Sequence, residues 1–228
     1  MGFFEQLQQQ TEAERQHVLT APVIQAVLDG RFDVNGYRYF LEQAFHHVRH
    51  TVPLMMACGA HLPDRLESVR EALVEYIEDE YGHDAWILND IEATGGDRQQ
   101  VRANKPCLPI ELMVSFLYDQ INRGNPAAFF GMVMVLEGTS IKLATQMGQI
   151  VQARLGLPAA AFSYLFSHGN LDLDHFQFFE KLMNTVDDPD DQRAIVHSAK
   201  VVYQLYGDML RSIPLPQAQS DEVKHAAA

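Results

Sequence analysis

The fold is decided by residues 126–156, which read PAAFFGMVMVLEGTSIKLATQMGQIVQARLG. Pro126 suits the first turn of a helix, because the N–H that proline lacks would have no partner there. Gly156 and Pro158 at the other end are typical helix breakers. All of the residues from Phe129 up to Glu137 are apolar or glycine. The stretch therefore predicts a long helix, at residues 126–155, that is buried on most sides ahead of Glu137.

The rest of the chain continues this pattern, with helical segments between Gly and Pro breakers and almost no alternation of the strand type. Pro53 should kink one of these helices. No linker divides the chain, so we predict one all-α domain over residues 1–213, a bundle of about seven long or medium helices. Residues 214–228 lose the apolar period and are expected to form a poorly ordered tail. The predicted helices lie near residues 3–19, 22–29, 36–61, 64–94, 109–122, 126–155, 158–167, 170–185 and 189–212.

Composition limits the classes of partner. The 228 residues carry a formal net charge of −13, which disfavours nucleic acid and anionic membranes as partners. The sequence has no signal-peptide pattern and no run of about 18 apolar residues, so we expect a cytoplasmic protein that does not span a membrane. Cys58 and Cys107 form no CxxC pair, which favours two idle thiols over a disulfide.

The first candidate for chemistry is Glu80-Tyr-Gly-His83, within the predicted helix 64–94. Residues three apart share a helix face, so this carboxylate and imidazole can bind one metal ion. The alternative is an ordinary charged helix, because Glu78 and other acids lie close by. Trp86, three residues after His83, either walls a site or packs in the core.

The second candidate is His168-Gly-Asn-Leu-Asp172-Leu-Asp-His175. His168, Asp172 and His175 have the spacing of one helix face, and two imidazoles with a carboxylate suit non-haem Fe(II). In the alternative, Gly169-Asn170 begins a helix, and the acids stabilise its N-terminus through the helix dipole. That alternative explains the aspartates and leaves the two histidines unexplained.

The third candidate is Glu137, because a buried carboxylate is costly unless it is paired or binds metal. A histidine or arginine from another helix is the alternative partner. The three candidates together supply three carboxylates and three histidines from three helices. That set fits two metal ions bridged by a carboxylate, with room for water, O2 or substrate.

A further group of histidines, His46, His47 and His50, lies in the predicted helix 36–61. His46 and His50 have the spacing to bind a metal or a haem. Their neighbours Glu42 and Arg49 favour a solvated face instead.

The six candidate ligands resemble the pattern of the haem-oxygenase-like di-iron oxidases: a Glu and a His on one helix, a Glu on the next, then His-x3-Asp-x2-His. These oxidases are the iron-containing redox branch of the superfamily that also holds the TenA thiaminases and the pyrroloquinoline-quinone synthase. The resemblance covers residues 37–209, and its last motif is the most specific. The compact gap between the first two motifs looks most like the enzymes that turn medium-chain fatty acids into terminal alkenes.

This resemblance implies a seven-helix fold and two Fe(II) ions, the second weakly bound, in an oxidase that uses O2 on a fatty acid, amino acid or amine. His83, His168 and His175 would then fix the ions, Glu80 and Asp172 would complete their coordination, and Glu137 would bridge or chelate. Glu80 and Glu137 are the expected catalytic residues. The residues chiefly expected to line the substrate pocket are Trp86, Phe130 and Met134. Phe129 and Met132 are expected to line it as well.

Two other classes stay open. One is a metal-independent member of the superfamily, either a hydrolase or a cofactor-free oxidase. A thiaminase is disfavoured, because neither cysteine falls in the helix after Pro126, and a haem oxygenase would need a glycine-rich helix that residues 131–138 do not supply. The second class is a non-enzymatic helical protein that binds a metal or a small ligand. A homodimer is compatible with each class.

Overall fold

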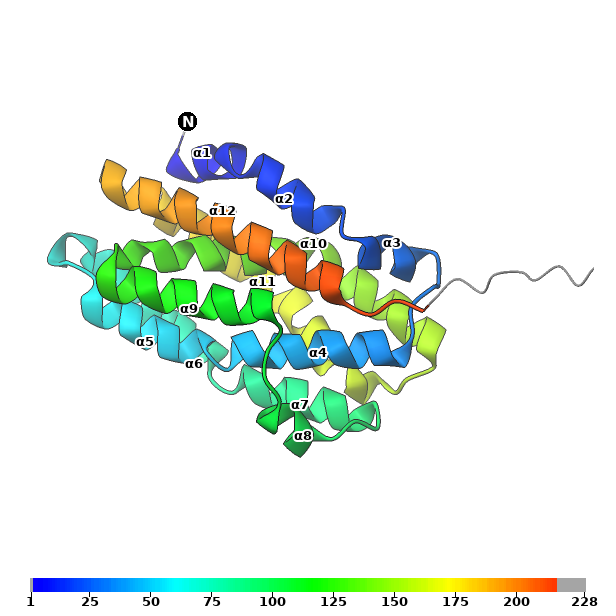
Figure 1. Ribbon diagram of the computed structural model, residues 1–228. Coiled ribbons are helices and arrows are strands. Elements are labelled where there is room, and N and C mark those ends of the chain that lie inside the picture. The colour runs from blue at the N-terminus through cyan, green and yellow to red at the C-terminus, as the bar shows by residue number, and fades with distance from the viewer. Residues whose placement is uncertain (1, 217–228) are drawn as a thin grey trace, which may run out of the picture.

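The computed structural model describes residues 2–216, apart from the side chains of residues 142 and 168–175. Within these limits the protein is built from helices, as predicted, and three short 3-10 turns at 64–66, 126–128 and 159–161. Figure 1 shows α1 to α3 following one side of α12, with α7 and α8 at the opposite side of the molecule, beyond α4. The α-helices are α1 (Phe3–Gln10), α2 (Glu12–Leu19), α3 (Pro22–Leu28), α4 (Val34–Val48), α5 (Thr51–His61), α6 (Glu67–Glu80), α7 (His83–Ala93), α8 (Arg98–Ala103), α9 (Leu108–Arg123), α10 (Phe129–Leu155), α11 (Ser163–Met183) and α12 (Pro189–Ser212).

The described residues form twelve α-helices, where the sequence predicted about seven. Three predicted helices are divided, because local groups interrupt the helical hydrogen bonds. The hydroxyl of Thr11 donates to the carbonyl of Leu7 (2.8 Å) between α1 and α2. Pro53 lacks the N–H that would bond to the carbonyl of Arg49, and α4 gives way to α5 at Arg49 and His50. The expected kink at Pro53 is therefore a break just ahead of it.

The two helices predicted at residues 158–167 and 170–185 are wrong: residues 159–161 form a 3-10 turn, and α11 runs unbroken from Ser163 to Met183. Its true start is fixed by Asp90 of α7, which is completely buried. This carboxylate accepts hydrogen bonds from the backbone N–H groups of Ser163 (3.0 Å) and Tyr164 (2.9 Å), and from the Ser163 hydroxyl. The free N–H groups of a helix N-terminus are thus satisfied by a side chain from another helix.

The predicted helix at residues 126–155 is confirmed as a 3-10 turn followed by α10. Its N-terminal half is buried, with Phe129, Phe130 and Val135 wholly inaccessible. The helix bends by 46° between Ile141 and Leu143. Just before the bend, the Ser140 hydroxyl donates to the carbonyl of Glu137 (3.0 Å), a bond of the kind that bends helices.

No single helix in the described part of the chain is long and apolar enough to cross a membrane. The two halves of α10 are long and apolar enough only when they are counted together across the bend.

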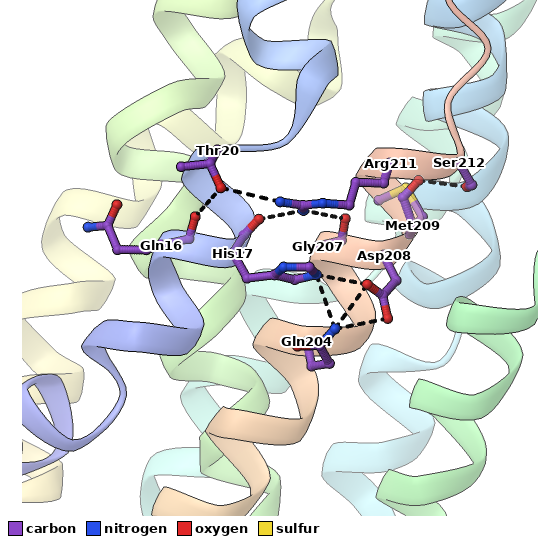
Figure 2. Close-up of polar contacts among 9 residues, drawn as sticks. All are labelled: Gln16, His17, Thr20, Gln204, Gly207, Asp208, Met209, Arg211 and Ser212. Atoms are coloured by element: carbon purple, nitrogen blue, oxygen red, sulfur yellow. Dashed lines mark hydrogen bonds and ion pairs between the residues drawn. The ribbon is translucent and has the colours of Figure 1, made fainter.

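Helix α2 is held against α12 by a group of polar contacts (Figure 2). Arg211 donates to the carbonyl of His17 (2.5 Å) and to the Thr20 hydroxyl (3.2 Å). The His17 Nε2 atom lies 2.7 Å from the Asp208 carboxylate. Gly207 lets the helices approach this closely, since an added Cβ atom would lie 2.4 Å from the His17 ring. These contacts fix the point at which α3 begins.

The cap on α11 predicts a large loss of stability in the variant Asp90→Ala. Two buried N–H groups would lose their acceptor, so we expect the unfolding free energy to fall by about 2–4 kcal/mol in urea titrations. Asp97→Ala is the matched control. Asp97 caps the short helix α8 by accepting from the N–H groups of Gln99 and Gln100, but it is exposed. Its loss should cost about 1 kcal/mol. Equal losses in the two variants would contradict the role of Asp90.

The same carboxylate predicts a pH dependence. Burial raises the pKa of Asp90 above its ordinary value of 3.8, although hydrogen bonds from Ser163 and Tyr164 oppose the rise. The folded protein therefore holds this proton more tightly than the unfolded chain does. That contribution to stability is complete below pH 3.8 and is lost as the pH rises through the folded pKa. Since Asp90→Asn cannot titrate there, the stability of the wild type relative to this variant should fall as the pH is raised in a series of urea titrations.

Candidate active site

A cavity of about 170 Å³ is lined by side chains from α3, α4, α5, α6, α10, α11 and α12. Most of its lining is apolar. The exceptions include the carboxylates of Glu80 and Glu137, the imidazole of His47 and the hydroxyl of Thr51. These side chains come from four different helices, so the polar part of the cavity depends on how the bundle packs.

Glu80 and His83 lie on two helices rather than one. Helix α6 ends at Glu80, Tyr81 is extended, Gly82 adopts a left-handed conformation (φ 94°), and α7 begins at His83. The prediction that they share one helix face is therefore wrong. The turn nevertheless brings them together, with His83 Nδ1 3.0 Å from a carboxylate oxygen of Glu80. Their side chains are only 3% and 12% exposed. Glu78, the neighbouring acid, is exposed to solvent.

Trp86 stacks on the ring of His83, with the ring centroids 4.1 Å apart and an interplanar angle of 29°. Both residues lie within α7, three positions apart and therefore on one face of the helix. Trp86 is not part of the cavity lining. It supports the histidine from the side.

Glu137 of α10 lines the cavity together with Met132, Val133 and Leu136. Phe130 and Met134, the other predicted pocket residues, are buried but do not line it, and nor does Phe129. An unbroken apolar run shows that a helix is buried without showing which of its faces meets a cavity. Only Met132 was placed in the lining from the sequence.

His168, Asp172 and His175 lie on α11, but their side chains are outside the described residues. Because α11 is continuous, Asp172 is not in a first turn, and the helix-start explanation for this motif does not hold. Tyr164 and Leu165, one and two residues into the same helix, line the cavity. Among the side chains that are described, no three His, Cys, Asp or Glu residues form a group that could hold a metal ion.

His47 is the lining residue that sequence reasoning missed. The solvated face expected for the histidine group is wrong for His46 and His47, each of which is only 4% exposed. The ring of His47 meets Tyr206 of α12 edge to face, at 6.0 Å between centroids. Burial raises the pKa of Tyr206 to about 12, so its hydroxyl stays protonated. The spacing of His47 from Thr51 and Met55, one and two turns on, was the available signal.

Neither cysteine belongs to the cavity lining. Cys58 is fully buried and its thiol donates to the carbonyl of Pro126 (3.3 Å). Burial raises the pKa of this thiol to about 12, which makes it a poor nucleophile. The cavity therefore has no thiol of the kind that a thiaminase needs.

The described helices form one domain with the haem-oxygenase-like fold. A domain of unknown function with this fold from Shewanella denitrificans superposes with a TM-score of 0.82 at 20% identity, covering 93% of this chain and 92% of its own. A TenA homologue from Pseudomonas syringae gives 0.75 at 12% identity, covering 90% of each chain. Haem oxygenase-1 from the cyanobacterium Synechocystis, solved with haem, gives 0.70 at 14% identity, covering 92% and 91%.

A family model described as iron-containing redox enzyme matches residues 38–207. The chain therefore belongs to this family, as the resemblance of its motifs predicted. No curated protein matches the sequence.

The break between α6 and α7 predicts a specific effect of Gly82→Ala. A side chain at this left-handed position is strained, and we expect a loss of about 1–2 kcal/mol in stability. The shift of His83 should also change the fluorescence of Trp86, the single tryptophan in the chain. Gly156→Ala is the matched control, since Gly156 (φ 63°) and Gly82 both face open space and Gly156 caps the far end of α10. The control should lose similar stability with no change in emission, and a change in both variants would contradict the link to His83.

Proposed function

We propose that this protein is an O2-dependent non-haem di-iron oxidase that acts on a small organic molecule with a long apolar part. The observation that carries the proposal is the presence of two carboxylates, Glu80 and Glu137, from different helices in the wall of one apolar cavity. Membership of an iron-containing redox family supports it. The three candidate ligands on α11 complete the set that the proposal requires.

The chemistry of the donors fits iron. A carboxylate in an apolar cavity is stabilised by a cation, and carboxylate with imidazole is a donor set that Fe(II) accepts. Glu80, His83 and Glu137 supply such donors from three helices, and His168, Asp172 and His175 would supply the rest from α11. When bound, the two Fe(II) ions would provide the electrons that activate O2.

The other contributions come from the chain itself. The contact between His83 Nδ1 and Glu80 fixes the orientation of the imidazole ring. The stacked Trp86 limits rotation of the ring. The apolar lining excludes water around the carboxylates, which strengthens every electrostatic interaction that they make. Glu137 would help to hold the iron ions, because its carboxylate lines the same cavity as that of Glu80.

The cavity favours a substrate with a long alkyl chain over a free amino acid. Its lining follows one face of α10 from Val133 to Val151, about 27 Å along the helix axis before the bend is considered. A free amino acid is much shorter than this, so it would leave most of the lining without contacts. A fatty acid or a long-chain amine can fill it. This agrees with the resemblance to the alkene-forming enzymes.

A metal-independent enzyme is the second candidate, favoured by the similarity in fold to a TenA homologue. Metal analysis of the purified protein separates it from the first, because it would turn over without iron. A binding protein without activity would take up iron and consume no O2.

Anaerobic addition of Fe(II) should quench the fluorescence of Trp86 and saturate near two equivalents. Exposure to O2 with a fatty acid should then give O2 uptake. Replacing His168 and His175 together by Ala should lower the uptake by roughly 100-fold or more, since both are proposed ligands. His61→Ala is the control, because His61 is exposed and its ring contacts the carbonyl of Ala57. Full turnover in air by the double variant would overturn the proposal.

A further inference from the structure

We propose that Val27, Phe32 and Val151 form an end wall that sets the length of the aliphatic chain accepted by the cavity. The inference rests on the proposed function for the identity of the polar end of the substrate. The wall itself follows from the positions of these three side chains, which come from α3, the turn after it, and the C-terminal half of α10.

The wall lies far from the carboxylates. Val151 follows Glu137 by fourteen residues on α10, about 21 Å along the helix before the bend is considered. The 46° bend near residue 142 lies between them. Beyond Thr139 and Ser140, which lie next to Glu137, the lining of α10 up to Val151 is apolar and consists of Leu143, Ala144 and Met147. A chain whose polar head lies at Glu137 would therefore point its methyl end toward Val151.

Helix α3 covers this end of the cavity with one face. Val23 and Val27 are 6% exposed and line the cavity together with Ile24. Leu28, on the outer face of the same helix, is 43% exposed. The side chains that an alkyl end would meet are therefore distinct from those that meet solvent.

Behind the wall, Val27, Phe32 and Val151 also border a narrow recess with Gly30, Ile150, Arg154 and Leu155, and this recess has no room for a water molecule. The cavity therefore ends at the three side chains. Shortening Val27 or Val151 would itself lengthen the space for a chain at this end.

Helix α3, which carries part of the wall, is held in place at both of its ends. The contacts of Arg211 with His17 and Thr20 hold the chain just before α3 (Figure 2). After α3, Gly30 takes a left-handed conformation (φ 70°), and the N–H of Arg31 bonds to the carbonyl of Ala26 (2.8 Å). This is the hydrogen bond of a Schellman cap, which ends a helix in one defined geometry.

The test is the binding of two series of straight-chain compounds, measured by calorimetry without O2. Primary alcohols of increasing length are titrated into metal-free protein, and fatty acids of the same lengths into protein loaded with Fe(II). In wild type, affinity should rise about fourfold per methylene and stop rising at one length. Val27→Ala and Val151→Ala should move that limit upward by one or two carbons. Val27→Phe should move it downward by at least two carbons.

Leu28→Ala is the matched control, one position along the same helix and on its outer face, and it should leave the limit unchanged. An unchanged limit in both alanine variants would overturn the inference, even if the phenylalanine variant failed to fold. The alcohol series needs neither iron nor O2. If the length limit moves in the wall variants while the protein consumes no O2, the proposed oxidase is rejected and the wall is kept. If the protein consumes O2 but the length limit does not move, the wall is rejected and the proposed oxidase is kept.

Discussion

The buried carboxylate of Asp90 is the contact on which the arrangement of the site depends. It joins α7, which begins at His83, to the first turn of α11, which carries the three remaining candidate ligands. A hydrogen-bonded carboxylate without exposure to water fixes both distance and direction, which apolar packing alone does not. The histidine beside Glu80 and the motif on α11 are thus placed relative to each other by one residue that lies outside the cavity.

Fold class and family could be predicted because they depend on signals that are repeated along the chain. Helical periodicity recurs in every segment, and the motif on α11 is the most specific part of the resemblance to the family. Helix boundaries were harder, because they depend on partners remote in sequence. Nothing near Ser163 indicates that Asp90, 73 residues earlier, supplies its cap. The division at Tyr81 and Gly82 was missed because the charged residues before it favour a continuous helix.

For the candidate site too, some residues could be predicted from the sequence and others could not. Glu80, His83 and Glu137 could be named from their types and spacing, and the structure brings Glu80 and Glu137 to one cavity and His83 to Glu80. His47 was assigned to solvent, because the polar residues around it suggested a surface helix. Phe130 and Met134 were assigned to the pocket, because an apolar run does not reveal which of its residues face the cavity. Which face of a buried helix meets a cavity is decided by neighbouring helices, and one sequence does not contain that information in a local form.

The bend divides α10 into two parts that contribute different residues to the cavity. Before the bend, the helix presents Glu137 just after a buried run that ends at Val135; beyond it, Val151 lines the cavity together with residues of α3. Substitutions in densely packed interiors spread strain to their neighbours. A wall that borders the cavity is different, since a change of side-chain volume there is taken up by the space of the cavity. Under the proposal, the length of the accepted chain can therefore change at the wall while the proposed metal ligands stay in register.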